Sequence, residues 1–548
     1  MPLASSPDED GPGPTPGDQA PEQAPPGGGD EVWSDGDVPT VQTDGDVTTV
    51  QTAGDGELPG PAAAVPPDDE LPVAPPPPAD EPAAPPVRWL RNRPLVVAGF
   101  LVACLVLALA LGVGRGTGPR PGAEPSPGLL SAGATQGQAA PRRTEQNEAL
   151  DRRAALTTLL RQRGEAVLGR NKASWLASVD PSQAGFRKQQ SVVFDRLRQL
   201  PLAAWRYQVL QDEPALGSVR QARLGPTAWV STVELSYRFK ADAVAIRRIE
   251  RLTARQVAGH WLIAADTDGA TDRDLWDLTP ISVRKGSRSV VVGASSQARN
   301  LTRFAKDVDV AARNVDKAWG TAWPRTVVVL VPDSLRQMAQ LLGRENTDGL
   351  DQLAAVTTGE VRRAGDVLAR PTGTADRVVL NPQAFGSEFG QAGRRLVLTH
   401  ELVHVATRSA AWCSPPIWVE EGFADFVAYR TSGLSRERIA SELVAAVRLG
   451  RAPAHLPSSE DFDPARNDVA QAYAGAWLAF DMMARAGGAD RAVEFYRSAA
   501  GIERHGHPPA KAPQVLEQAY ADVLGVDGAT FERKWRDYVA AVAVKSSR

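Results

Sequence analysis

Residues 229–239 alternate between two kinds of side chain, with apolar residues at most odd positions from Trp229 to Phe239 and polar residues at most positions between them. A period of two predicts a half-buried strand, and residues 260–265 predict another. Upstream, apolar positions have helical spacing from 154 to 176, and a second helix is predicted over 189–200. Helices followed by antiparallel strands indicate an α+β domain over residues 145–268.

This order of elements resembles the nuclear-transport-factor-like cone fold, in which helices pack into a curved sheet. Folds of that kind often hold a ligand cavity or a dimer face, but no motif in residues 145–268 indicates chemistry. We therefore expect a spacer or docking module. His260, beside Trp261, is interpreted as a strand residue and not as a metal ligand.

The second half of the chain predicts a separate domain over residues 282–545. Short apolar runs at 289–292, 326–331 and 377–380 predict strands, and helices are predicted over 301–319 and 335–342. From residue 473 onwards the pattern is helical, with predicted helices at 473–483, 492–499, 515–524 and 531–542. The domain should therefore contain a small sheet and a helical part. His505 and His507 lie near two prolines, where a solvated loop is favoured over a second metal site.

The longest uncharged apolar stretch runs for nineteen residues, from Leu95 to Val113. That length is sufficient to span a bilayer. Arg88, Arg91 and Arg93 precede it, and the excess of basic residues on this side predicts a cytoplasmic amino terminus. The sequence thus predicts a single-pass anchor in the cell membrane, with everything after residue 114 outside the cell.

Charge is distributed unevenly about this stretch. Residues 1–87 hold 18 Asp or Glu and no Lys or Arg, and they are rich in Pro and Gly, which predicts a disordered acidic tail. Residues 114–143 have the composition of a flexible linker. Thr43 and Thr52 lie in a near-repeat of the tail, where a partner that reads phosphothreonine could bind, but duplicated low-complexity sequence is the favoured explanation of the repeat.

The chemistry of the chain is concentrated in the segment Thr-His-Glu-Leu-Val-His, residues 399–404. Because positions i and i+4 share one face of a helix, His400 and His404 can offer two imidazoles to one zinc ion while Glu401 lies beside them. Catalytic zinc takes three protein ligands and leaves one position open, so a third donor must come from elsewhere. The second motif, Trp-Val-Glu-Glu-Gly-Phe-Ala-Asp at 418–425, contains the best candidate, Glu421.

This pair of motifs resembles the gluzincin zinc metallopeptidases, and most closely the membrane-anchored, peptidase MA-like bacterial proteins. Separately, the high content of Ala, Arg, Gly and Pro is typical of an actinobacterial source. The resemblance implies that Glu421 is the third zinc ligand and that Asp425 orients a zinc-binding imidazole. Asp425→Ala should then weaken zinc binding by about 10–100-fold. Glu420 could serve the other histidine or face solvent. The segment around Tyr473 is similar to the one that supplies an oxyanion donor in the family, although a packed tyrosine at a helix start is an equal alternative.

Glu401 is the candidate general base for water activated by zinc, which predicts peptide-bond hydrolysis. Gluzincins bind extended substrate along an edge strand, and the resemblance places this strand at 377–380. The Gly-x-Met-Glu-Asn signature of the aminopeptidases is missing. An endopeptidase is therefore expected. The alternative is a non-catalytic cell-wall or partner-binding protein with a structural zinc site. Cys413 is interpreted as an inert buried thiol, with a thiolate ligand or redox switch as the alternative.

The part of the chain after residue 87 is basic. It contains all 61 Lys and Arg residues of the sequence but only 47 of the 65 Asp and Glu residues. A basic exterior favours anionic neighbours such as cell-wall polymers or lipid headgroups. We expect peptide or protein substrates and no nucleic-acid partner.

Overall fold

The computed structural model describes residues 139–213, 216–363, 371–502 and 512–545. The predicted acidic tail, the predicted membrane span at 95–113, Thr43, Thr52, His505 and His507 lie outside these ranges, as does most of the predicted linker. Within the described ranges, no helix has both the length and the apolar character needed to cross a bilayer. The helix α1 already begins at Ala139, inside the segment predicted to be linker.

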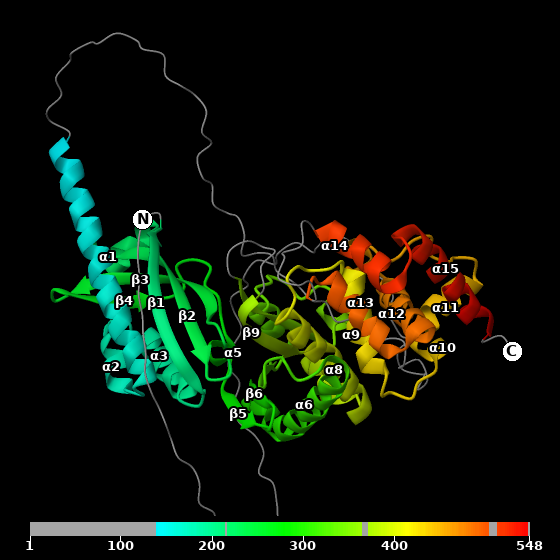
Figure 1. Ribbon diagram of the computed structural model, residues 1–548. Helices are drawn as coiled ribbons and strands as arrows, with labels where there is room; N and C mark the ends of the chain where they lie inside the picture. The colour runs from blue at the N-terminus through cyan, green and yellow to red at the C-terminus, as the bar shows by residue number, and fades with distance from the viewer. Residues whose placement is uncertain (1–138, 214–215, 364–370, 503–511, 546–548) are drawn as a thin grey trace, which may run out of the picture. The chain divides into compact units, whose positions relative to one another are not determined.

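The amino-terminal part of the described chain places three helices against one antiparallel sheet (Figure 1). The sheet has the order β1-β2-β3-β4, so each strand pairs with the next strand in the sequence. The elements are α1 (Ala139–Leu168), α2 (Lys172–Ala177), α3 (Ala184–Leu197), β1 (Leu202–Asp212), α4 (Ser218–Leu224), β2 (Trp229–Phe239), β3 (Ile246–Val257), β4 (His260–Ala265) and α5 (Leu275–Leu278).

The predicted helices and strands of this part are present, with two differences. The helical segment expected from 154 to 176 is interrupted at Arg170, whose φ of 55° belongs to the left-handed region, so α1 and α2 are separate helices. Strands β1 and β3 were not predicted, because polar and charged residues interrupt the alternation of each. His260 is the first residue of β4, as expected.

A five-stranded mixed sheet follows, in the order β5-β6-β7-β9-β8. β6, β7 and β9 are parallel, while β5 and β8 pair antiparallel to their neighbours. The strands are β5 (Ile281–Lys285), β6 (Ser289–Ala294), β7 (Val327–Val331), β8 (Ala355–Arg363) and β9 (Pro371–Leu380), and the helices among them are α6 (Ala298–Trp319) and α7 (Leu335–Leu341), with 3₁₀ turns η2 (Ser295–Gln297) and η3 (Leu350–Gln352).

Both faces of this sheet are covered, which is why its central strands are continuous apolar runs. Val291, Val329 and Val378 belong to one hydrophobic core, which they share with α6 and with the helices that follow the sheet. Val292 and Leu330 point the other way and belong to a second core, which contains Trp276. The predicted strands at 289–292, 326–331 and 377–380 are confirmed as β6, β7 and β9.

The predicted position of the edge strand is wrong. Residues 377–380 belong to β9, which is paired on both sides, with β7 and with β8. The strand at this edge of the sheet is β8, which the sequence did not reveal because its run of small, threonine and charged residues lacks a clear period of two.

The rest of the described chain is helical (Figure 1). The predicted helices after residue 473 are confirmed, with the third of them divided between α14 and a π-helical turn. The elements are η4 (Ala384–Glu388), α8 (Gln391–Arg408), α9 (Ile417–Tyr429), α10 (Arg436–Ile439), α11 (Ser441–Arg448), η5 (Ser459–Phe462), α12 (Val469–Gly487), α13 (Ala489–Ala499), α14 (Ala512–Ala519), η6 (Tyr520–Leu524) and α15 (Gly528–Lys545). The chain therefore has a mixed α/β architecture.

Candidate metal centre

Two helices carry the candidate metal ligands. His400 and His404 lie one turn apart on α8, and Glu421 lies in the second turn of α9. The ligand atoms of these three side chains all lie within 4.8 Å of one another, and all three residues are buried. The structure thus brings together the three side chains that the sequence predicts as ligands.

The individual distances show which atoms converge. Nε2 of His400 lies 3.1 Å from Oε2 of Glu421 and 3.0 Å from Nε2 of His404. Nε2 of His404 lies 3.7 Å from the same carboxylate oxygen. Two imidazole nitrogens and one carboxylate oxygen face a common point, which is the donor set of a three-ligand catalytic zinc site.

Asp425 lies behind the first histidine. Its Oδ1 is 2.8 Å from Nδ1 of His400 and so can accept the proton on that nitrogen, which leaves Nε2 directed toward Glu421. A hydrogen bond of this kind fixes the tautomer and the ring orientation of a metal-binding histidine. Asp425 therefore lies where the sequence predicted it to act.

The electrostatics of the cluster favour a positive charge between its members. Burial lowers the pKa of His400, but hydrogen bonds to Asp425 and Glu421 outweigh this effect and raise the pKa to about 10. Burial alone would raise the pKa of Glu421, yet the adjacent His404 and His400 lower it to about 2. Two buried carboxylates around two imidazoles thus stabilise a cation, and a divalent metal ion fits this requirement.

Glu401 is completely buried and points its carboxylate toward β8. Its Oε2 accepts a hydrogen bond of 2.5 Å from Oγ1 of Thr357, a residue 44 positions earlier in the chain. Its Oε1 is buried and has no hydrogen-bond partner among the described residues. One oxygen is therefore held in place, and the other is available to a group that enters the site.

Glu420 does not form a hydrogen bond with His404 in the part of the chain that the structure describes. It is half-buried, and burial together with the charge of Glu421 raises its pKa to about 8, while Arg408 opposes this shift. The suggestion that Glu420 orients His404 is therefore not accompanied by a hydrogen bond between the two described side chains.

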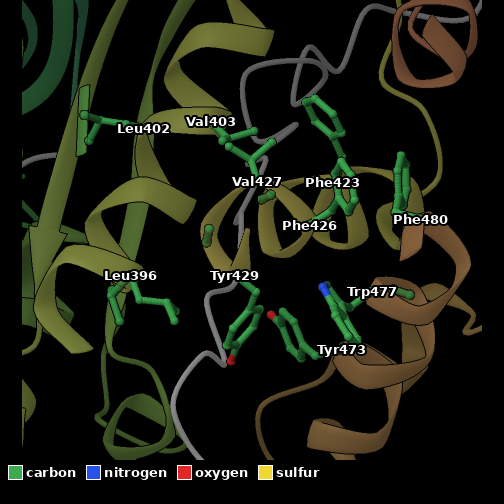
Figure 2. Close-up of a cluster of buried hydrophobic side chains, with 14 of the residues drawn as sticks. Leu396, Leu402, Val403, Phe423, Phe426, Val427, Tyr429, Tyr473, Trp477 and Phe480 are labelled. Carbon is green, nitrogen blue, oxygen red and sulfur yellow. The ribbon is translucent and has the colours of Figure 1, made fainter. Parts of the chain in front are cut away.

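Tyr473 is buried in the first turns of α12, where its ring stands edge-on to Phe462 with the ring centres 5.1 Å apart. Figure 2 shows it in a hydrophobic cluster beside Tyr429 and Trp477. Tyr473 thus packs in the hydrophobic core, and its role as an oxyanion donor remains a prediction. Cys413 is buried, with its sulfur 3.7 Å from the carbonyl oxygen of Ala499, and it is not part of the metal cluster.

The metal helices are held by packing and by a buried ion network. Leu402, Val403 and Phe423 lie in the cluster of Figure 2, which joins α8 and α9 to α12. At the start of α8, Asp307 of α6 accepts hydrogen bonds from Arg394 at 3.0 Å and from Arg395 at 2.9 Å. This contact orients α8 on α6, because the buried carboxylate of Asp307 meets two guanidinium groups.

Two residues of the site were not predicted from the sequence. Thr357 lies on the unpredicted strand β8, and no spacing rule connects it with Glu401. Asp307 appears in the sequence as one of several charged residues on an amphipathic helix, so only its burial distinguishes it.

No family model matches the chain, and no curated protein matches it. Solved structures similar to it include a point mutant of a two-domain M1 zinc metallopeptidase bound to L-arginine (15% identity, TM-score 0.27) and native yeast LTA4 hydrolase (16% identity, TM-score 0.29). A third is a mutant M1 zinc metallopeptidase from Deinococcus radiodurans (14% identity, TM-score 0.26).

These alignments cover 52%, 51% and 52% of this chain and 58%, 43% and 58% of the respective structures, so the chain matches only about half of each. Because the identities and TM-scores are low, the functional assignment rests on the geometry of the site.

Proposed function

We propose that this protein is a zinc-dependent peptidase that hydrolyses peptide bonds, with His400, His404 and Glu421 as the metal ligands. One observation carries the proposal: three donor atoms converge within 4.8 Å while the adjacent Glu401 keeps one buried carboxylate oxygen without a partner among the described residues. A structural zinc site has four protein ligands and no use for a base. The three-member donor group therefore favours catalysis over a scaffold role.

When bound, zinc acts as a Lewis acid that makes a water molecule acidic and polarises a carbonyl group. Glu401 then serves as general base: its Oε1 accepts the proton of the attacking water and later delivers it to the leaving amine. Thr357 holds the other oxygen so that the carboxylate cannot rotate away. Asp425 keeps the ring of His400 in its orientation, and Tyr473 is retained as a candidate donor to the oxyanion.

Strand β8 suggests how an extended substrate binds. Within the described residues it is the edge strand of the five-stranded sheet, and Thr357 on this strand touches Glu401. A peptide that adds a strand at this edge would place its backbone beside the general base. Such binding requires no free peptide terminus, which supports an endopeptidase.

We further propose that residues 95–113 anchor the chain in the cell membrane and that the described part lies outside the cell, where peptides or proteins near anionic cell-wall polymers are its substrates. The support comes from the apolar run and the basic residues before it. A protease-protection assay on intact cells checks the orientation: the carboxyl-terminal part should be degraded by external protease, and its protection would contradict this topology.

The deciding experiment is cleavage of a diverse peptide library by the purified full chain, with and without a chelator, mapped by mass spectrometry. Cleavage should require the metal, and Glu401→Gln should lower kcat by about 100–10,000-fold while zinc content and the unfolding temperature stay unchanged. Glu494→Gln, on the exposed face of α13, is the matched control and should retain activity. Stoichiometric zinc without any cleavage by the unaltered chain would instead support the structural-zinc alternative.

A further inference from the structure

A second polar site lies far from the metal centre in the sequence, between the helices and the four-stranded sheet of the amino-terminal part. It is a cavity of about 30 Å³, and its lining includes Arg163, Tyr207, Glu250, Asp266, Trp276 and Asp277. A cavity of this size holds about two water molecules. Phe186 and Asp272 also line it and are half-buried and exposed, respectively, so the cavity can be reached from solvent on that side.

Glu250 is out of place in the strand pattern. On β3 it pairs with Val233, which is completely buried, and Leu252 two positions later is also buried. Side chains two apart on a strand share a face, so the carboxylate of Glu250 lies on the inner face of the sheet. No hydrogen bond or ion pair to Glu250 is found within the described residues.

Asp266 provides a second unsatisfied acceptor in the same cavity. It is 6% exposed, and its Oδ2 accepts a hydrogen bond of 2.7 Å from Arg273. Its Oδ1 is buried and has no hydrogen-bond partner among the described residues. A buried carboxylate oxygen without a donor is costly, so a bound group that donates an N–H to this oxygen would be stabilised there.

Acidic side chains outnumber basic ones around the cavity. Four carboxyl groups line it, from Glu250, Asp266, Asp272 and Asp277, against two guanidinium groups, from Arg163 and Arg273. Among the described residues no hydrogen bond joins Arg163 to Glu250. Arg163 donates instead to neutral acceptors: the carbonyl oxygen of Trp175, the hydroxyl of Ser178 and the side-chain oxygen of Gln190.

Aromatic rings complete the walls. Trp205 and Trp276 line the cavity with their ring centres 6.3 Å apart, and Tyr207 stands edge-on to Trp205. Arg163 already lies over the ring of Trp175, so one wall of this site binds a cation in the native fold. Aromatic faces together with carboxylates are the chemistry that recognises ammonium groups.

We propose that this cavity binds a primary ammonium head group, which donates its N–H groups to Glu250 and to Oδ1 of Asp266. The small volume limits the buried part of the ligand to a group about the size of methylammonium, while the rest of a longer molecule would extend past Phe186. The inference does not depend on the proposed peptidase activity, because none of these residues belongs to the metal centre.

The test is a titration of the full chain with methylammonium chloride, followed by saturation-transfer NMR at constant ionic strength. The unaltered protein should bind it saturably and should not bind tetramethylammonium, which has no N–H group and is larger. Glu250→Gln, which replaces the ionisable carboxyl group by a neutral amide at constant size, should weaken binding by at least about 10-fold. Glu234→Gln is the control, because Glu234 lies on the neighbouring strand with its side chain on the opposite face.

Absence of saturable binding by the unaltered protein, or equal binding by Glu250→Gln, would overturn the proposal, and the first of these outcomes requires no variant to fold. Ammonium groups occur in free amines and at the amino terminus of peptides. In a Glu401→Gln background, where hydrolysis is prevented, Gly-Gly amide and its acetylated form separate the two sources. Displacement of methylammonium by the free peptide alone identifies a peptide amino terminus, and displacement by neither identifies a small amine.

Discussion

Nδ1 of His400 lies 2.8 Å from Oδ1 of Asp425, and both side chains are buried. The two residues are 25 positions apart, on α8 and α9, so this hydrogen bond exists only because the two helices pack together. It directs Nε2 of the same ring toward Glu421, which means that the packing of two helices determines how the metal ligands are presented.

Loss of this hydrogen bond should weaken metal binding without loss of the ligands themselves. Asp425→Ala is expected to lower zinc affinity by about 10–100-fold, because the ring of His400 then loses its fixed tautomer and orientation. Competition with a chromogenic chelator measures the affinity. Asp490→Ala, near the start of α13, is a control that should bind zinc as the unaltered protein does; an unchanged affinity of Asp425→Ala would contradict the role of Asp425.

Thr357→Val should lower kcat by about 10-fold, since it removes a hydrogen bond to a charged carboxylate at nearly constant volume. Zinc content should not change, because Thr357 does not contact the ligands. Steady-state kinetics on a cleaved peptide, with zinc measured in parallel, distinguishes the two effects. Thr358→Val, the next residue on β8, points to the opposite face of the strand and is the matched control.

The close approach of α9 and α12 depends on Gly422. A β-carbon at this position would lie 2.5 Å from the carbonyl oxygen of Ala476, which is backbone and cannot move aside. Gly422→Ala should therefore destabilise the fold by about 1–3 kcal/mol, and it should lower zinc content because Glu421 is the adjacent residue. Thermal unfolding and metal analysis test both effects.

Gly390 provides the comparison for that substitution. A β-carbon there meets nothing within 4 Å, and its φ of −64° suits any residue. Gly390→Ala should be close to neutral. Similar unfolding temperatures for the two alanine variants would show that the contact between α9 and α12 is looser than the structure indicates.

The ammonium-binding cavity should also affect stability as a function of pH. Burial, together with the charges of Asp277 and Asp266, raises the pKa of Glu250 to about 8, although Arg163 and Arg273 oppose this shift. Burial likewise raises the pKa of Asp277 to about 7. Because the folded protein holds these protons more tightly than the unfolded chain, the stabilisation is present below about pH 4.5 and is lost as the pH rises toward 8.

The expected loss between pH 5 and pH 8.5 is on the order of 1–3 kcal/mol, since Glu250 is only partly shielded from solvent. Denaturant unfolding of the full chain at several pH values measures it. Glu250→Gln should make the dependence less steep, because one of the two shifted groups is then absent. An equally steep dependence in that variant would assign the effect to other carboxyl groups.

Several features of the protein can be predicted from the sequence because they depend on local periodicity. His400 and His404 face one way because an α-helix repeats every 3.6 residues, and no tertiary information is needed for that. The strands β6 and β7 are recognisable because both faces are buried and each contains an uninterrupted run of at least three valines. Strands with mixed composition, such as β3 and β8, have no such signature.

The tertiary structure alone determines the contacts between segments that are distant in sequence. Three such features result from packing: the hydrogen bond of Thr357 to Glu401, the strand order that places β8 at the edge, and the position of Glu250 opposite the buried Val233. Sequence patterns record which face of an element is apolar, but they do not record which element covers that face. The sequence therefore identifies the kinds of side chain that can bind the metal, whereas the convergence of their donor atoms on one point is a property of the folded chain.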